Sequence, residues 1–93
     1  MDLYPRDGKY GHAAVFPLVK RAIVSNSVVL PVCAMVCNFN KANSEEEDSL
    51  MSFDEVETFF HEFGHIMHNI CSEATFAKFS GTSVERDFVE LPS

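Results

Sequence analysis

Two histidines four residues apart, His61 and His65, enclose a glutamate in the run His-Glu-Phe-Gly-His at positions 61–65. On a helix, side chains at this spacing project from one face about one turn apart, so both imidazoles can bind one tetrahedral zinc ion at about 2.0–2.1 Å. Glu62 is rotated by about 100° from His61. It therefore flanks the ion, where it can take a proton from a water molecule that the ion activates. The pattern predicts a catalytic zinc site with Glu62 as general base.

A third protein ligand must come from another part of the chain, because a catalytic zinc normally has three such ligands and one open position. Glu73 is in line with the same predicted helix and is too near. The other downstream acids follow the turn at Gly81 and can fold back toward the histidines. Asp87 and Glu90 share a helical face, so one can bind the ion while the other orients a histidine. Spacing alone leaves Glu85 and Glu90 open.

Neighbouring residues of similar chemistry fit the metal site less well. His68 shares the stripe of His61 but lies about 10 Å further along the helix, so we expect it at the surface or behind a ligand. Cys33 and Cys37 would be separated by more than about 13 Å in a strand, and we interpret them as small buried hydrophobic residues. A glycine within the motif, Gly64, costs helix stability and predicts a close approach near the metal.

A β-hairpin is predicted to precede the motif. Residues 1–12 contain repeated Pro, Asp and Gly and indicate a loop, whereas residues 13–40 are rich in β-branched and aromatic side chains. Within them we expect strands at 13–19 and 28–38, separated by a polar break at 25–27. The second strand is continuously apolar, which predicts burial on both of its faces. An isolated hairpin cannot supply that burial, so the strand is expected to need covering protein from outside this chain.

The zinc-binding helix is predicted to span residues 52–72, after an acidic loop at 41–51. Ser52 is the expected N-cap, with Glu55 as its capping-box partner. Residues 82–93 would carry the third ligand, with a helical turn or two at 84–91. Helical periodicity places the apolar side chains of the main helix on one broad face, which we expect to be buried: Val56, Phe59, Phe60, Phe63, Ile66, Met67 and Ile70.

Composition restricts the partners and the compartment. The formal charge of −7 and the scattered Lys and Arg residues argue against nucleic acid. The longest apolar run, 28–37, is half the roughly 20 residues that span a bilayer, and the N-terminus has no features of a signal peptide. Three cysteines without disulfide spacing favour a reducing compartment, so we expect a cytoplasmic protein that does not bind membranes.

Four stretches together resemble one family of enzymes. Residues 59–68, which contain the motif, residues 79–82 (Phe-Ser-Gly-Thr), residues 87–93 (Asp-Phe-Val-Glu-Leu-Pro-Ser) and residues 2–12 are similar to the thimet oligopeptidase and neurolysin family of zinc peptidases. The resemblance implies one zinc ion bound by His61, His65 and Glu90, with Glu62 as general base. It also implies short peptide substrates and a monomeric, mostly intracellular enzyme whose site lies in a deep channel between two largely helical lobes.

The main departure from that family is length, because its members are several times longer than 93 residues. Their tyrosine and histidine groups that stabilise the tetrahedral intermediate lie in sequence beyond Ser93. We therefore interpret residues 1–93 as a partial catalytic domain: an α+β fragment of a mostly α-helical zinc peptidase. Alone it is expected to bind zinc weakly and hydrolyse peptides poorly. The alternative is a non-catalytic zinc-binding or interaction module.

Overall fold

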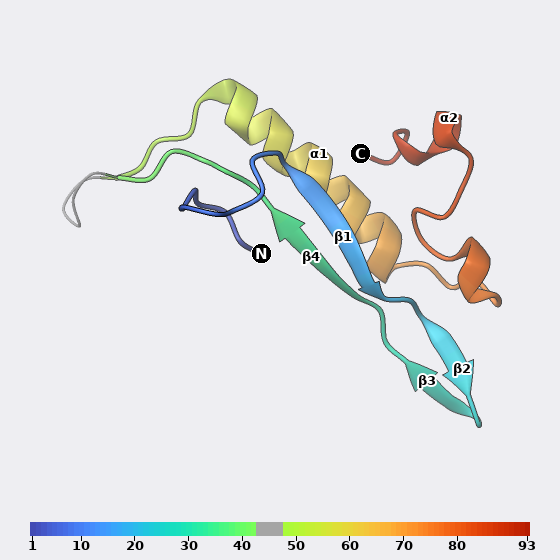
Figure 1. The fold of residues 1–93 in the computed structure, drawn as a ribbon. Helices are drawn as coiled ribbons and strands as arrows, with labels where there is room; N and C mark the ends of the chain where they lie inside the picture. The colour runs from blue at the N-terminus through green and yellow to red at the C-terminus, as the bar shows by residue number, and fades with distance from the viewer. Residues whose placement is uncertain (43–47) are drawn as a thin grey trace.

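The chain folds as a long β-hairpin that lies along one helix, followed by a short C-terminal segment that returns to the same helix (Figure 1). The structure, a computed structural model, describes residues 1–42 and 48–93. The predicted acidic loop at 41–51 therefore falls partly outside the described residues. In chain order the elements are β1 (Ala14–Val19), β2 (Ala22–Val24), β3 (Ser27–Val29), β4 (Val32–Val36), α1 (Phe53–Ile70), a 3-10 turn (Ala77–Phe79) and α2 (Arg86–Val89).

The predicted hairpin is confirmed, although its strands are interrupted. β1 pairs antiparallel with β4, and β2 pairs antiparallel with β3. Ser25 and Asn26 form the turn with φ of 49° and 64°, the positive pair that two-residue hairpin loops need. The predicted strand 13–19 corresponds to β1, whereas the predicted strand 28–38 is divided into β3 and β4. Pro31, which cannot donate a ladder hydrogen bond, lies between β3 and β4, and the β1–β4 register shifts after Pro17.

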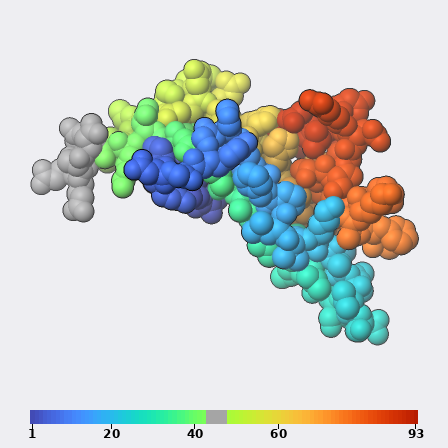
Figure 2. Space-filling model, viewed as in Figure 1, coloured from blue at the N-terminus to red at the C-terminus, as the bar shows by residue number. Residues whose placement is uncertain are grey.

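The second strand is buried only in its inner half, so the described residues do not supply the cover that burial along its whole length requires. Met35 and Cys37 are buried, with 1% and 0% exposure, but Val28, Leu30 and Val32 are exposed. The physical reason is coverage: α1 packs against β1 and β4 and does not extend to the hairpin tip, which forms a projection at one end of the molecule (Figure 2). The core therefore lies between the inner half of the hairpin and α1, and consists of Met35, Cys37, Phe39 and Ile66.

Helix α1 begins as its capping signal predicts. The Ser52 hydroxyl accepts a hydrogen bond from the Glu55 backbone N–H at 3.2 Å, and the Glu55 carboxylate accepts one from the Ser52 N–H at 2.8 Å. The helix ends at Ile70 with Cys71 as C-cap, close to the predicted 52–72. Within the described residues, no helix is long and apolar enough to cross a membrane.

The apolar face of α1 is only partly buried, which corrects the sequence prediction. Its packed side centres on Glu62, Ile66 and Asn69, which are at most 9% exposed. Phe60 and Met67, about 120° and 100° around the helix from Ile66, are 66% and 40% exposed. The predicted apolar arc is wider than the surface that the hairpin covers, so its far edge faces solvent.

Acidification is expected to weaken the start of α1 through Glu55. Its carboxylate accepts hydrogen bonds from the backbone N–H groups of Asn40 and Ser52, which lower the pKa of Glu55 below its ordinary value of 4.5. A pKa lowered by folding gives stability that is present above pH 4.5 and is lost as the pH falls through the folded value. Urea unfolding followed by circular dichroism between pH 3 and 7 measures this loss.

The matched control for that titration is Glu55→Gln, which keeps the shape of the side chain and cannot ionise. Its stability should change less with pH in the same window than that of the unmodified chain. The pKa of Asp2 is also lowered, by hydrogen bonds from Arg6 and Lys9, so both proteins retain the slope due to Asp2. Equal slopes in the two proteins would contradict the assignment to Glu55.

Candidate metal centre

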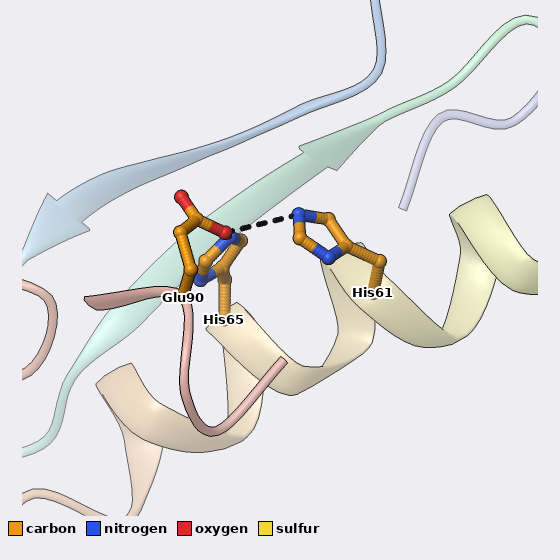
Figure 3. Close-up of side chains that lie close together, drawn as sticks. All are labelled: His61, His65 and Glu90. Carbon is orange, nitrogen blue, oxygen red and sulfur yellow. Dashed lines mark ion pairs between the residues drawn. The ribbon is translucent and has the colours of Figure 1, made fainter. Parts of the chain in front are cut away.

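Three side chains from two parts of the chain converge beside α1 (Figure 3). His61 and His65 project from neighbouring turns of the helix, with ring centroids 4.9 Å apart and rings nearly perpendicular. Glu90 follows directly after α2 and points its carboxylate between the two rings. Its Oε2 lies 3.3 Å from Nε2 of His61 and 3.3 Å from Nε2 of His65. The structure thus brings together the two motif histidines and one of the acids that spacing had left open.

The geometry of this group fits a zinc ion. A tetrahedral ion with bonds of about 2.0–2.1 Å holds its ligand atoms about 3.3–3.4 Å apart. Both contacts from the Glu90 carboxylate to the imidazoles have that length, and all three ligand atoms lie within 4.8 Å of one another. Two imidazole nitrogens and one carboxylate oxygen are also the donor types of a catalytic zinc, with a fourth position left open.

The group is open to solvent on one side. The side chains of His61 and Glu90 are 43% and 60% exposed, whereas that of His65 is 13% exposed. An ion held here would be accessible to water and to a substrate. The three residues of the group do not themselves enclose such a substrate.

Close backbone contact brings Glu90 to the histidines. A Cβ atom added at Gly64 would lie 2.5 Å from Cα of Ser93 and 2.8 Å from the carbonyl oxygen of Pro92. The Ser93 hydroxyl in turn contacts the backbone oxygen of Glu90 at 3.0 Å and its carboxylate at 3.3 Å. The close approach predicted at Gly64 is present, and the approaching group is the chain's own C-terminal segment.

Gly64→Ala is expected to weaken zinc binding by about tenfold, because the added methyl group displaces residues 92–93 and with them Glu90. The same change should stabilise the helix itself by roughly 0.5–1 kcal/mol. A loss of zinc affinity with no loss of helix content, measured by chelator competition and circular dichroism, is therefore the expected pair of results. Gly11→Ala is the matched control, since a Cβ there meets nothing within 4 Å. Equal affinity in both variants would show that Gly64 does not govern access for Glu90.

Glu62 lies outside this group of three, on the side of α1 that packs against the sheet. It is 8% exposed. Its carboxylate is a neighbour of the Cys37 thiol, whose pKa is raised first by burial and then by the charge of Glu62. Glu62 is therefore shielded from solvent at the position in α1 that directly follows His61.

The remaining sequence candidates lie away from the group. Within residues 1–42 and 48–93, only His61, His65 and Glu90 form a cluster with metal-ligand spacing. Glu73, Glu85 and Asp87 are exposed, and the described residues provide no hydrogen-bond partner for Nδ1 of His65. One of the two acids Asp87 and Glu90 was expected to orient a histidine. Within the described residues, Asp87 does not do so for His65.

Two other sets of residues are placed by their packing. The His68 ring packs edge-on against Phe88 of α2, with centroids 6.3 Å apart, and so contacts the segment that carries Glu90. Cys33 and Cys37 are free thiols, partly and fully buried respectively. Their interpretation as small packed side chains agrees with the structure.

Sequence reasoning did not identify Asn69. It is 8% exposed on the packed side of α1, and it hydrogen-bonds both to the helix and to the segment before α2. The available signal was its position: Asn69 lies within the arc of the helix that also contains Ile66, where a polar side chain needs a partner.

Comparisons with known proteins cover the whole chain. Residues 1–93 match the family model described as peptidase family M3. The chain is 55% identical to a thimet-like oligopeptidase of Dictyostelium discoideum over 100% of its length, 46% identical to saccharolysin of Saccharomyces cerevisiae over 99%, and 39% identical to a dipeptidyl carboxypeptidase of Escherichia coli over 99%. It spans 14%, 13% and 13% of those three proteins.

Proposed function

Because the chain belongs to peptidase family M3, we propose that it forms the catalytic metal centre of a zinc-dependent endopeptidase that hydrolyses short peptides. The observation that carries the proposal is the position of Glu90, whose carboxylate oxygen lies 3.3 Å from each of the two histidine nitrogens. The names of its relatives, oligopeptidase and carboxypeptidase among them, support peptides as the substrate class.

In this proposal each residue has a defined task. His61 and His65 would hold the ion through Nε2, and Glu90 would hold it through Oε2. Zinc, when bound, supplies a Lewis acid that polarises the scissile carbonyl and lowers the pKa of water. Glu62 accepts the proton of the attacking water on its carboxylate and then donates it to the nitrogen of the leaving amine. Its sheltered position beside His61 limits exchange of that proton with bulk solvent.

The exposure of the site supports weak activity for these 93 residues alone. His61 and Glu90 are 43% and 60% exposed, so the described residues do not exclude water or align a peptide over the metal. Absence of preorganised groups for the tetrahedral oxyanion alone lowers rates by about 10²–10³-fold. The proposal for the longer parent is a mostly helical, monomeric, cytoplasmic enzyme with a channel that admits short peptides.

A quenched fluorogenic peptide, incubated with the purified chain, tests the proposed function. Slow turnover that stops with a zinc chelator and returns on addition of zinc is expected. The reference is a full-length relative such as saccharolysin, assayed with the same peptide. Turnover that persists in the chelator would contradict zinc catalysis. Turnover at the rate of the full-length relative would contradict the expected weakness of the isolated chain.

A further inference from the structure

The segment that carries Glu90 is joined to α1 by a small buried polar contact around Asn69. The Asn69 side-chain amide donates a hydrogen bond to the backbone carbonyl of His65 at 2.9 Å. Its carbonyl oxygen faces Thr82, at 3.4 Å from the hydroxyl and 3.5 Å from the backbone N–H. One side chain thus contacts the backbone of a metal-site histidine and the chain that leads to Glu90.

Gly81 makes this contact possible. The φ of Gly81 is +60°, a conformation that L-residues rarely adopt. A Cβ added at Gly81 would collide with Oδ1 of Asn69 and lie 3.1 Å from the Cα of Asn69. The neighbouring Ser72 hydroxyl accepts hydrogen bonds from the Gly81 N–H at 3.0 Å and from the Ser80 hydroxyl at 3.3 Å. Residues 80–82, called here the 80–82 turn, therefore rest directly on Asn69 in the last turn of α1 and on Ser72, which follows the helix.

We propose that Asn69 and Gly81 are positioning residues that hold Glu90 at the metal centre. Apart from this turn, the segment contacts α1 through Pro92 and Ser93 at Gly64 and through Phe88 at His68, while α2 contains no buried residue and the Glu90 side chain is 60% exposed. Without the 80–82 turn in place, closing the site means ordering the 20 residues from the end of α1 to Glu90, residues 71–90. With it in place, only the eight residues after Thr82, residues 83–90, remain to be ordered. Loop-closure entropy makes that difference worth about fourfold in the affinity for the ion.

The cavity beside the ligands supports a direct effect on the metal site. It has a volume of about 180 Å³ and is lined by Val15, His65, Asn69, Thr82, Val89 and Glu90. The contact between Asn69 and Thr82 therefore forms part of the wall that also contains two of the three ligands. A shift of the 80–82 turn reshapes this wall and moves Glu90 relative to His65.

This inference rests on the proposed function, and zinc affinity of the purified chain tests it without an activity assay. Competition with a chromophoric chelator should show about fourfold weaker binding in Gly81→Ala. Gly8→Ala is the matched control, because Gly8 also has a positive φ, +76°, but an added Cβ meets nothing within 4 Å. Gly8→Ala introduces a similar backbone strain but no contact with Asn69. Its zinc affinity should therefore stay within about twofold of that of the unmodified chain, a smaller change than the loop-closure effect.

A double variant isolates the contact itself. In an Asn69→Ala background the atoms that obstruct a Cβ at position 81 are largely removed, so Gly81→Ala should weaken zinc binding by a smaller factor than it does alone. The visible spectrum of the cobalt-substituted chain gives a second readout, because displacement of Glu90 changes the coordination of the ion. Gly81→Ala should shift that spectrum toward that of Glu90→Gln.

The outcomes separate the two proposals. If Gly81→Ala and Gly8→Ala bind zinc equally, while Glu90→Gln loses affinity, the positioning role is overturned and the metal site stands. If Glu90→Gln keeps the affinity of the unmodified chain, the proposed function fails as well. Gly81 lies outside α1, so the comparison of the two glycine variants remains decisive even if Asn69→Ala lowers helix content.

Discussion

Glu62→Gln is expected to lower the rate of peptide hydrolysis by about 10²–10⁴-fold, the usual contribution of a general base. The amide keeps the size and shape of the side chain but cannot accept the proton of the attacking water. Zinc affinity should change little, because Glu62 is not among the three residues whose ligand atoms converge. Initial rates with a fluorogenic peptide, together with a zinc titration of the same sample, measure both quantities.

Glu73→Gln is the matched control for this substitution. Glu73 is exposed just after α1 and lies outside the metal group, so the loss of its charge should leave the rate unchanged. Because Glu62 is buried, circular dichroism must show that the variant keeps its helix. A folded Glu62→Gln variant that binds zinc and retains the full rate would remove Glu62 from the mechanism.

Glu90→Gln is expected to reduce zinc affinity by more than about 100-fold, since even residues that only orient metal ligands contribute 10–100-fold. The neutral amide replaces an anionic oxygen that lies 3.3 Å from both histidine nitrogens. The fold should be retained, because the side chain is 60% exposed and contacts mainly Ser93 and the histidines. Chelator competition on the purified chain gives the affinity directly.

Glu85→Gln provides the comparison that decides between the two acids left open by spacing. Glu85 precedes α2, is exposed and is not part of the converging group. Its substitution should leave zinc affinity unchanged. A larger loss of zinc affinity in Glu85→Gln than in Glu90→Gln would indicate that Glu85 is the third ligand. That result would contradict the position of Glu90 in the structure.

Local features of this site were predictable from the sequence. The spacing of His61 and His65 fixes their geometry once the segment is helical, and the Ser52 and Glu55 pair marks where that helix begins. The hairpin turn was also predictable, because a polar break between two β-rich segments leaves few alternatives. These features depend on interactions between residues at most a few positions apart.

Features that depend on distant parts of the chain were not predictable in the same way. Spacing could not choose Glu90 over Glu85, because the choice depends on the contacts that Gly64 and Asn69 make with the segment that folds back onto α1. The buried part of α1 was misjudged because periodicity gives the apolar arc but not the width of the surface that covers it. The apolar tip of the hairpin is exposed because the described residues do not supply the cover that its strand was expected to need.

X-ray absorption at the zinc edge of the zinc-loaded chain tests the central claim most directly. Two histidine nitrogens, one carboxylate oxygen and one further oxygen predict a single shell of light ligands at about 2.0–2.1 Å, with the imidazole scattering of two rings. The Glu90→Gln variant, loaded with excess zinc, should show altered coordination with the histidine signal retained. A shell of sulfur at about 2.3 Å, from Cys33 or Cys37, would indicate a different, structural type of site and would contradict the account.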